Sequence, residues 1–153
     1  MDGGIRARAL FVLEAPGPKA VRSGFVSRNN PDETAKNMLN LLAEAGFSRH
    51  ETVLWNIVPW YIGDEKEIHS PKAMDIACGL EYLVQLTALL SILKAIVFVW
   101  KKAQRASKLI SFVTPIRIFE SYHPSPQFVN RRPGNRDRIL ESFRDVRANL
   151  TGR

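Results

Sequence analysis

Four short runs of apolar residues alternate along the chain with stretches of helical periodicity. The first three runs are almost continuously apolar, which is typical of strands buried on both faces, and the fourth alternates polar with apolar residues, which suits an edge strand. The runs cover residues 9–13, 52–58, 95–100 and 115–120. Apolar stripes with helix start and stop signals predict helices after each run. These helices cover residues 31–46, 70–93, 101–112 and 135–150, and the polar residues 19–30 predict a loop.

The alternation of strands with helices indicates an α/β fold. We expect a three-layer sandwich, in which helices cover both faces of a central, four-stranded, mainly parallel sheet. At 153 residues the chain fits a single domain, residues 1–153. The carboxyl ends of parallel strands meet at one edge of such a sheet, where α/β proteins bind their ligands. We therefore expect the functional residues to follow the four apolar runs.

Positive charge is concentrated in the C-terminal part of the chain. The formal net charge is +7, but residues 1–93 have nine Lys/Arg against eleven Asp/Glu, whereas residues 94–153 have thirteen against four. Such an asymmetry indicates a polyanionic partner, most simply nucleic acid, although a solvated basic face would have the same composition.

Several classes of protein do not fit the sequence. The longest apolar stretch, residues 83–93, is too short for a membrane span, and no signal-peptide pattern opens the chain, so we expect a cytoplasmic protein. Cys78 is the single cysteine, and we expect it to be a small buried side chain. The three histidines lack the spacing of metal ligands. We expect no cofactor and no metal, and a monomer is the default.

Polar residues that could take part in binding or catalysis lie at the ends of the apolar runs. Glu14 directly follows the first run, Asn56 is the single polar residue inside the second, and His123 follows the fourth. A buried amide needs several hydrogen-bond partners, so Asn56 either contacts a ligand or is satisfied by neighbouring backbone. Lys101 and Lys102 begin the third helix, where cations oppose the helix dipole; they indicate a phosphate site or a solvated basic face.

These residues lie in motifs that resemble those of the uracil-DNA glycosylase superfamily. The motifs are Glu14-Ala15-Pro16-Gly17, Gly24-Phe25-Val26, Asn56 and His123-Pro124-Ser125-Pro126. Each motif is weak alone, but the set occurs in the right order over about residues 9–130 and on the expected elements. The first motif is similar to that of the branch with a Glu-Ala-Pro-Gly sequence, although this chain lacks the iron–sulfur cysteines of that branch.

The resemblance implies how a base would be recognised. Phe25 would stack on a uracil flipped out of the DNA, and Asn56 would contact its Watson–Crick edge with both a donor and an acceptor, which favours uracil over cytosine. Ala15, Pro16 and Gly17 would line the base site. His123 would donate a hydrogen bond to uracil O2, where negative charge develops as the glycosidic bond breaks, unless it is a core histidine held by backbone.

The role of the acid is open. Better-known branches of the superfamily have Asp or Asn at the position of Ala15, where it positions the attacking water. Glu14 would orient the water, stabilise the cationic sugar or hold its loop by hydrogen bonds.

The resemblance also places DNA contacts around the same edge of the sheet. These are Lys101, Lys102, Ser125, Phe128, Arg131 and Arg132. Ser125 would contact a phosphate, a role also suited to Ser121 and to the backbone at Gly17. Phe128 would either fill the space left by the flipped nucleotide or pack inward. Trp100 departs from the pattern, because a small residue is expected after the third strand.

From these residues we expect a monofunctional DNA repair glycosylase that hydrolyses the N-glycosidic bond of uracil in DNA and leaves an abasic site. Ala15 and Trp100 favour an alternative, a protein that binds damaged or abasic DNA without cutting the bond. A third hypothesis is an enzyme acting on a nucleotide or sugar phosphate, whose DNA binding would be weak and insensitive to salt.

Overall fold

Four parallel strands form the central sheet of the protein. A computed structural model describes residues 2–64, 69–110 and 116–152, without the side chains of Lys102, Arg105, Lys108 and Leu109. The strands are β1 (Ala9–Leu13), β2 (Thr52–Asn56), β3 (Ala95–Val99) and β4 (Arg117–Ser121). Their order is β2-β1-β3-β4, and every neighbouring pair is parallel. The predicted α/β sandwich with a four-stranded sheet is confirmed, and the alternating strand β4 lies at an edge.

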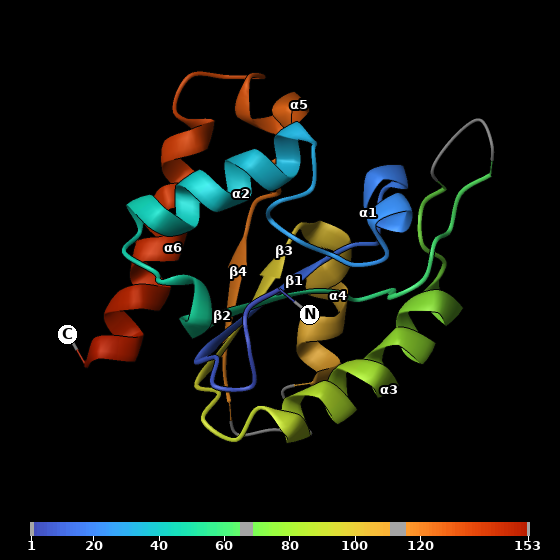
Figure 1. Ribbon diagram of the computed structural model, residues 1–153, viewed down its shortest axis with the longest axis horizontal. Coiled ribbons are helices and arrows are strands. Elements are labelled where there is room, and N and C mark those ends of the chain that lie inside the picture. Colours follow the sequence, from blue (N-terminus) through green and yellow to red (C-terminus); the bar gives the residue numbers. More distant parts are fainter. Residues whose placement is uncertain (1, 65–68, 111–115, 153) are drawn as a thin grey trace.

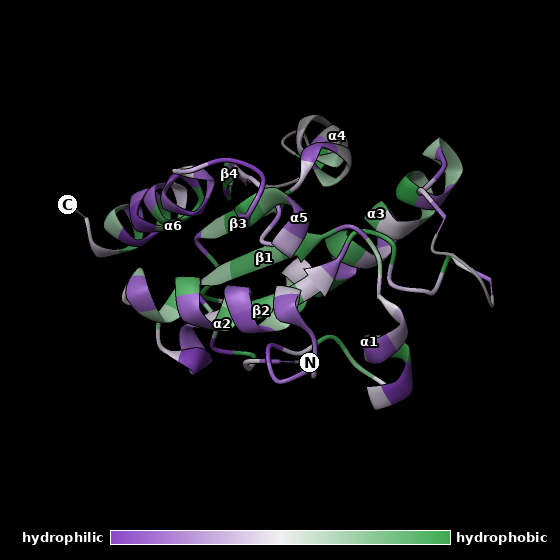
Figure 2. Cartoon of the chain, turned by 90° about the horizontal axis from the view of Figure 1, so that it is seen from above, coloured by the Kyte–Doolittle hydropathy of each residue, from purple (hydrophilic) through white to green (hydrophobic). Residues whose placement is uncertain are grey.

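Helices cover both faces of this sheet (Figure 1). On one face lie α2 (Glu33–Glu44) and α6 (Asn135–Thr151); on the other lie α3 (Ala73–Leu89) and α4 (Lys101–Ile110). Three short helices complete the described chain: α1 (Pro18–Ser23), η1 (Arg49–Glu51) and α5 (Pro126–Val129). Viewed from above, the hydrophobic strands lie between the helices; α2 and α6 are largely hydrophilic, whereas α3 is mostly hydrophobic and exposes Met74, Tyr82 and Leu89 (Figure 2).

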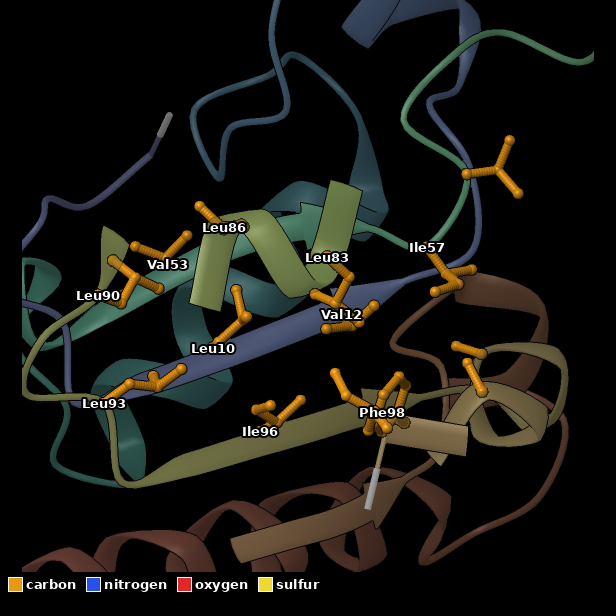
Figure 3. Close-up of a cluster of buried hydrophobic side chains, with 14 of the residues drawn as sticks. Leu10, Val12, Val53, Ile57, Leu83, Leu86, Leu90, Leu93, Ile96 and Phe98 are labelled. Atoms are coloured by element: carbon orange, nitrogen blue, oxygen red, sulfur yellow. The ribbon is translucent and has the colours of Figure 1, made fainter. Parts of the chain in front are cut away.

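The strands divide their side chains between two hydrophobic cores. In β1, Leu10 and Val12 point toward α3 and α4, whereas Ala9 and Phe11 point toward α2 and α6, as the alternation of a strand requires. Figure 3 shows the first core, in which Leu83 of α3 packs over the sheet. Because both faces are buried, the strands are fixed in register and their carboxyl ends form a rigid edge.

The structure corrects three local expectations. Residues 18–23 form helix α1 inside the predicted loop, because Pro18 occupies the first helical turn and Gly24 ends it with a φ of 81°. The long helix begins at Ala73 rather than Ser70, because the Lys72 N–H donates to the Asp75 carboxylate at 2.8 Å. Cys78 is exposed on α3 and is not the expected buried side chain. The predicted end of the third helix, residues 111–112, lies outside the described residues.

The described residues lack two further features. None of the helices there combines the length and hydropathy of a membrane span. The same residues contain no group of three or more His, Cys, Asp and Glu side chains that could hold a metal ion.

Gly79→Ala should destabilise the protein by about 1–3 kcal/mol, because the added methyl group overpacks a close contact. Gly79 is buried in α3, and a Cβ there would lie 1.7 Å from the Ile57 carbonyl oxygen, just beyond β2. Gly4→Ala is the control, since a Cβ at Gly4 meets no atom within 4 Å. Urea unfolding of both variants measures the difference, and equal midpoints would contradict the prediction.

Candidate active site

A cleft of about 580 Å³ lies at the carboxyl edge of the sheet. Residues that follow all four strands line it: Glu14 to Gly17 after β1, Asn56 at the end of β2, Trp100 after β3, and His123 after β4. Helices α1 and α2 and the loop between them contribute most of the remaining lining. The structure thus brings together Glu14, Asn56 and His123, which are separated by more than forty residues along the chain at each step.

Asn56 presents an unpaired amide to this cleft. It pairs in register with Leu13 of β1, and Ile57 N–H then donates to Leu13 O at 2.8 Å. The residue is 3% exposed, and its side-chain amide makes no hydrogen bond with any residue that the structure describes. Because the amide lines the cleft and has no partner among the described residues, its donor and acceptor are open to a ligand, which favours the ligand-contacting role for Asn56 over the purely structural one.

His123 is held as a neutral hydrogen-bond donor. The Ser125 N–H donates to His123 Nδ1 at 3.1 Å, so in the neutral ring the proton lies on Nε2. Burial, which disfavours the imidazolium, lowers the pKa of His123 from 6.5 to about 4, against the opposing charge of Asp32. At neutral pH the side chain can therefore donate through Nε2 without being a cation.

The loop that bears His123 is anchored from both helices of the adjacent face. Asn37 of α2 donates to Pro124 O at 2.9 Å, and Asn135, the first residue of α6, donates to Phe128 O at 2.7 Å. The Ser121 and Ser142 hydroxyl oxygens lie 2.6 Å apart. These bonds fix the loop against the rigid sheet and so fix the position of the imidazole.

A second hollow of about 330 Å³ adjoins the cleft. Phe25, Trp55 and Tyr61 give it aromatic walls. The two hollows share Pro16, Ala20, Val26, Leu54 and Asn56. Phe25 is 55% exposed and lines the second hollow, not the cleft that contains His123. Asn56 is therefore accessible from an aromatic side and from a side with ionisable groups.

A buried carboxylate near the N-terminus supports the loop after Phe25. Asp2 accepts hydrogen bonds from the Arg28 N–H at 2.6 Å and the Ser27 hydroxyl at 3.1 Å, and it pairs with the Arg28 Nε at 3.2 Å. Arg49 adds a second cation at 2.9 Å. Since Val26 and Ser27 line the cleft, this ion cluster fixes one of its walls.

The predicted DNA contacts lie at different places around the site. Ser125 lines the cleft, and its hydroxyl accepts from Phe128 N–H at 3.4 Å as the N-cap of α5. Phe128 is half-buried, packs against the core of α2 and α6, and stacks on Tyr122 with ring centroids 5.0 Å apart. Of the two orientations considered for Phe128, the structure has the inward one. The exposed cations are Lys101, Arg131 and Arg132, whereas the side chain of Lys102 lies outside the described residues.

Ser121, the alternative site for a phosphate contact, is buried and does not face the predicted DNA-binding edge. The side chain is 4% exposed and its hydroxyl pairs with Ser142. The alternation of β4 turns it toward α6, away from solvent.

Sequence reasoning missed several residues that line the cleft. Asp32, the N-cap of α2, accepts the Ala35 N–H at 2.8 Å, and Lys19 and Arg22 come from α1. A helix start at Asp32 was predictable, but its approach to His123 was not. The cations of α1 were missed because the helix itself was not predicted.

His123 should make folding stability fall as the pH is lowered from 6.5 toward 4. Its folded-state pKa is about 4, below the ordinary 6.5, so between these values the unfolded chain binds a proton that the folded chain does not. The stability lost in this way is small above pH 6.5 and reaches about 2–3 kcal/mol near pH 4.5. Urea unfolding at pH 7 and 4.5 measures it. His123→Asn should show a smaller loss, and the same loss in both proteins would contradict the assignment.

Comparisons with known proteins agree with this arrangement. Residues 1–147 match the model of the family described as the uracil DNA glycosylase superfamily. The crystal structure of wild-type SMUG2 from Pedobacter heparinus superposes with a TM-score of 0.67 and 11% identity, covering 97% of this chain and 77% of that one. The solution structure of a Methanosarcina acetivorans protein named as a candidate uracil DNA glycosylase superposes with a TM-score of 0.61 and 10% identity. It covers 95% of this chain and 94% of that one. No curated protein sequence matches this chain.

Proposed function

We propose that this chain, which belongs to the uracil DNA glycosylase superfamily, hydrolyses the N-glycosidic bond of uracil in DNA. The observation on which the proposal rests most is the unpaired amide of Asn56 in a cleft that also contains His123 and Glu14. An amide presents a donor and an acceptor side by side, as the N3–H and O4 edge of uracil requires. The edge of cytosine has the opposite arrangement at these atoms, so an amide oriented for uracil would be mismatched with cytosine.

The base would occupy the region where the two hollows meet. There its edge would face Asn56, which both hollows share, and its face would lie toward Phe25 of the second hollow. Stacking on an aromatic ring and hydrogen bonding of the edge are the usual means of holding a flipped base. Ala15, Pro16 and Gly17 would form the wall after β1.

The reaction would proceed through a cationic sugar and an anionic base. The bond between C1′ and N1 breaks and its electron pair goes to uracil. The neutral His123 would donate a hydrogen bond from Nε2 to uracil O2, where negative charge develops. Glu14, in the same cleft, would stabilise the positive charge on the sugar. Water then adds to C1′ and loses a proton, which leaves an abasic site.

Exposed cations around the cleft would hold the DNA. Lys101 begins α4 directly after β3, and Arg131 and Arg132 lie between α5 and α6 after β4, so all three follow the carboxyl ends of strands. Contacts of this kind position the duplex without specifying its sequence, and they make binding depend steeply on salt.

An oligonucleotide containing one uracil tests the proposal. With enzyme in excess, followed by alkaline cleavage of abasic sites, the uracil strand should be cut and the matched cytosine strand should not. Asn56→Leu should reduce cutting by about 10- to 100-fold, since a bidentate contact with one base is worth roughly 1–3 kcal/mol. No cutting by the wild-type protein would refute the proposal. Tight binding of the uracil strand without cutting would instead support a DNA-binding protein.

A further inference from the structure

Trp100 has a backbone conformation that tryptophan rarely adopts. Its φ is 94°, and among the described residues it is the one non-glycine residue with a positive φ. A side chain with a Cβ is strained there, whereas glycine is not. Strain of this kind persists only when the surrounding structure imposes it, and it is frequent at functional sites.

Hydrogen bonds to the neighbouring strand hold the strained residue. The Trp100 N–H donates to Ser121 O at 3.0 Å, and the Gln104 side-chain amide donates to the same oxygen at 3.0 Å. The Gln104 N–H in turn donates to Trp100 O at 3.0 Å. Trp100 is thus fixed to the end of β4, two residues before His123.

The indole is directed to the cleft, where it meets the imidazole. Trp100 lines the cleft but belongs to neither hydrophobic core. Its ring centroid lies 6.0 Å from that of His123, with an interplanar angle of 74°. This is the edge-to-face geometry that aromatic rings prefer. With this positive φ, the Trp100 indole contacts His123 in the cleft instead of packing in a hydrophobic core.

We propose that Trp100 is a positioning residue for His123: its indole fixes the plane of the imidazole and keeps water away from it. The inference concerns the same site as the proposed glycosylase activity and rests on it for its effect on rate. The placement of the imidazole, however, can be measured without any substrate.

Three variants of the full chain test the role. Trp100→Gly removes the indole and also relieves the strained φ, so the unfolding temperature should not fall. The pKa of His123, followed by NMR of its ring protons, should rise from about 4 by at least one unit as water reaches the ring. Glu14, Lys19, Arg22 and Asp32, the other ionisable groups lining the cleft, remain in place. Trp100→Phe should keep the low pKa, and Trp60→Ala, which changes a tryptophan outside the cleft, should not alter it.

Single-turnover rates on uracil DNA complete the test. Trp100→Gly should be at least tenfold slower than the wild type, and Trp100→Phe should recover most of the rate. A pKa and a rate both unchanged in Trp100→Gly would overturn the inference. Should that variant not fold, Trp100→Leu is compared with Trp100→Phe, and identical His123 pKa values in the two would overturn it. If the wild type releases no uracil, the proposed function fails, while the His123 titration still decides the role of Trp100.

Discussion

His123→Ala should lower the single-turnover rate of uracil release by about 100- to 1000-fold. The variant loses the donor that we propose to contact uracil O2, and removal of a comparable oxyanion donor costs roughly 3–4 kcal/mol of transition-state stabilisation. Because the pKa of His123 is lowered to about 4, the wild-type donor is neutral throughout pH 5–8. The wild-type rate should therefore not show a titration of His123 in that range.

His50→Ala is the matched control for this variant. His50 is exposed in η1, outside the residues that line the cleft, and its replacement should leave the rate within twofold of the wild type. His123→Gln retains an N–H donor in a different position and should lie between the wild type and His123→Ala. A His123→Ala rate within threefold of the wild type would remove the imidazole from the proposed mechanism.

The strands of the fold were predictable because both faces of the sheet are buried. A short, continuous apolar run such as residues 95–99 predicts a strand buried on both faces. The alternation of such runs with helices predicts parallel pairing of the strands. Helix ends were less predictable. The start of α3 depends on a carboxylate, Asp75, which caps the Lys72 N–H, whereas the sequence pattern predicted a start at Ser70.

The acid, the amide and the imidazole could be placed together from sequence for the same reason. Each follows or ends a strand, and parallel strands bring their carboxyl ends to one edge. The orientation of the side chains that follow the strands could not be predicted from the sequence. Phe128 packs partly against the core of α2 and α6 and also stacks on Tyr122, and the contact of Trp100 with His123 depends on a φ that no local pattern indicates.

The wall of the cleft formed by Val26 and Ser27 depends on a residue that sequence reasoning did not consider. Asp2 lies at the start of the chain, and only the tertiary structure shows its carboxylate buried between Arg28 and Arg49. Gly3 is part of the same feature: with a φ of 108° it brings the chain against β2, where a Cβ would lie 1.8 Å from Thr52 O. The N-terminal segment therefore supports the site through packing that leaves no periodic signal.

Asp2→Asn should destabilise the protein by about 3–5 kcal/mol, because it leaves a buried guanidinium without its counter-ion. The Asp2 and Arg28 side chains are 0% and 2% exposed. Burial raises the pKa of Asp2, but the Arg28 N–H and the charges of Arg28 and Arg49 outweigh it and lower the pKa below its usual 3.8. The stabilisation is therefore complete above about pH 4 and is lost as the pH falls through the lower, folded-state pKa. Urea unfolding at pH 7 measures the variant.

An exposed ion pair provides the control that separates burial from charge. Glu44 and Arg136 pair at the surface with 44% and 40% of their side chains exposed, so Glu44→Gln should cost less than about 1 kcal/mol. Asp2→Asn combined with Arg28→Met should cost less than the sum of the two single changes, because the double variant leaves no buried charge unpaired. If Asp2→Asn costs no more than Glu44→Gln, the buried cluster does not hold the loop, and Val26 and Ser27 must keep their places in the cleft by other contacts.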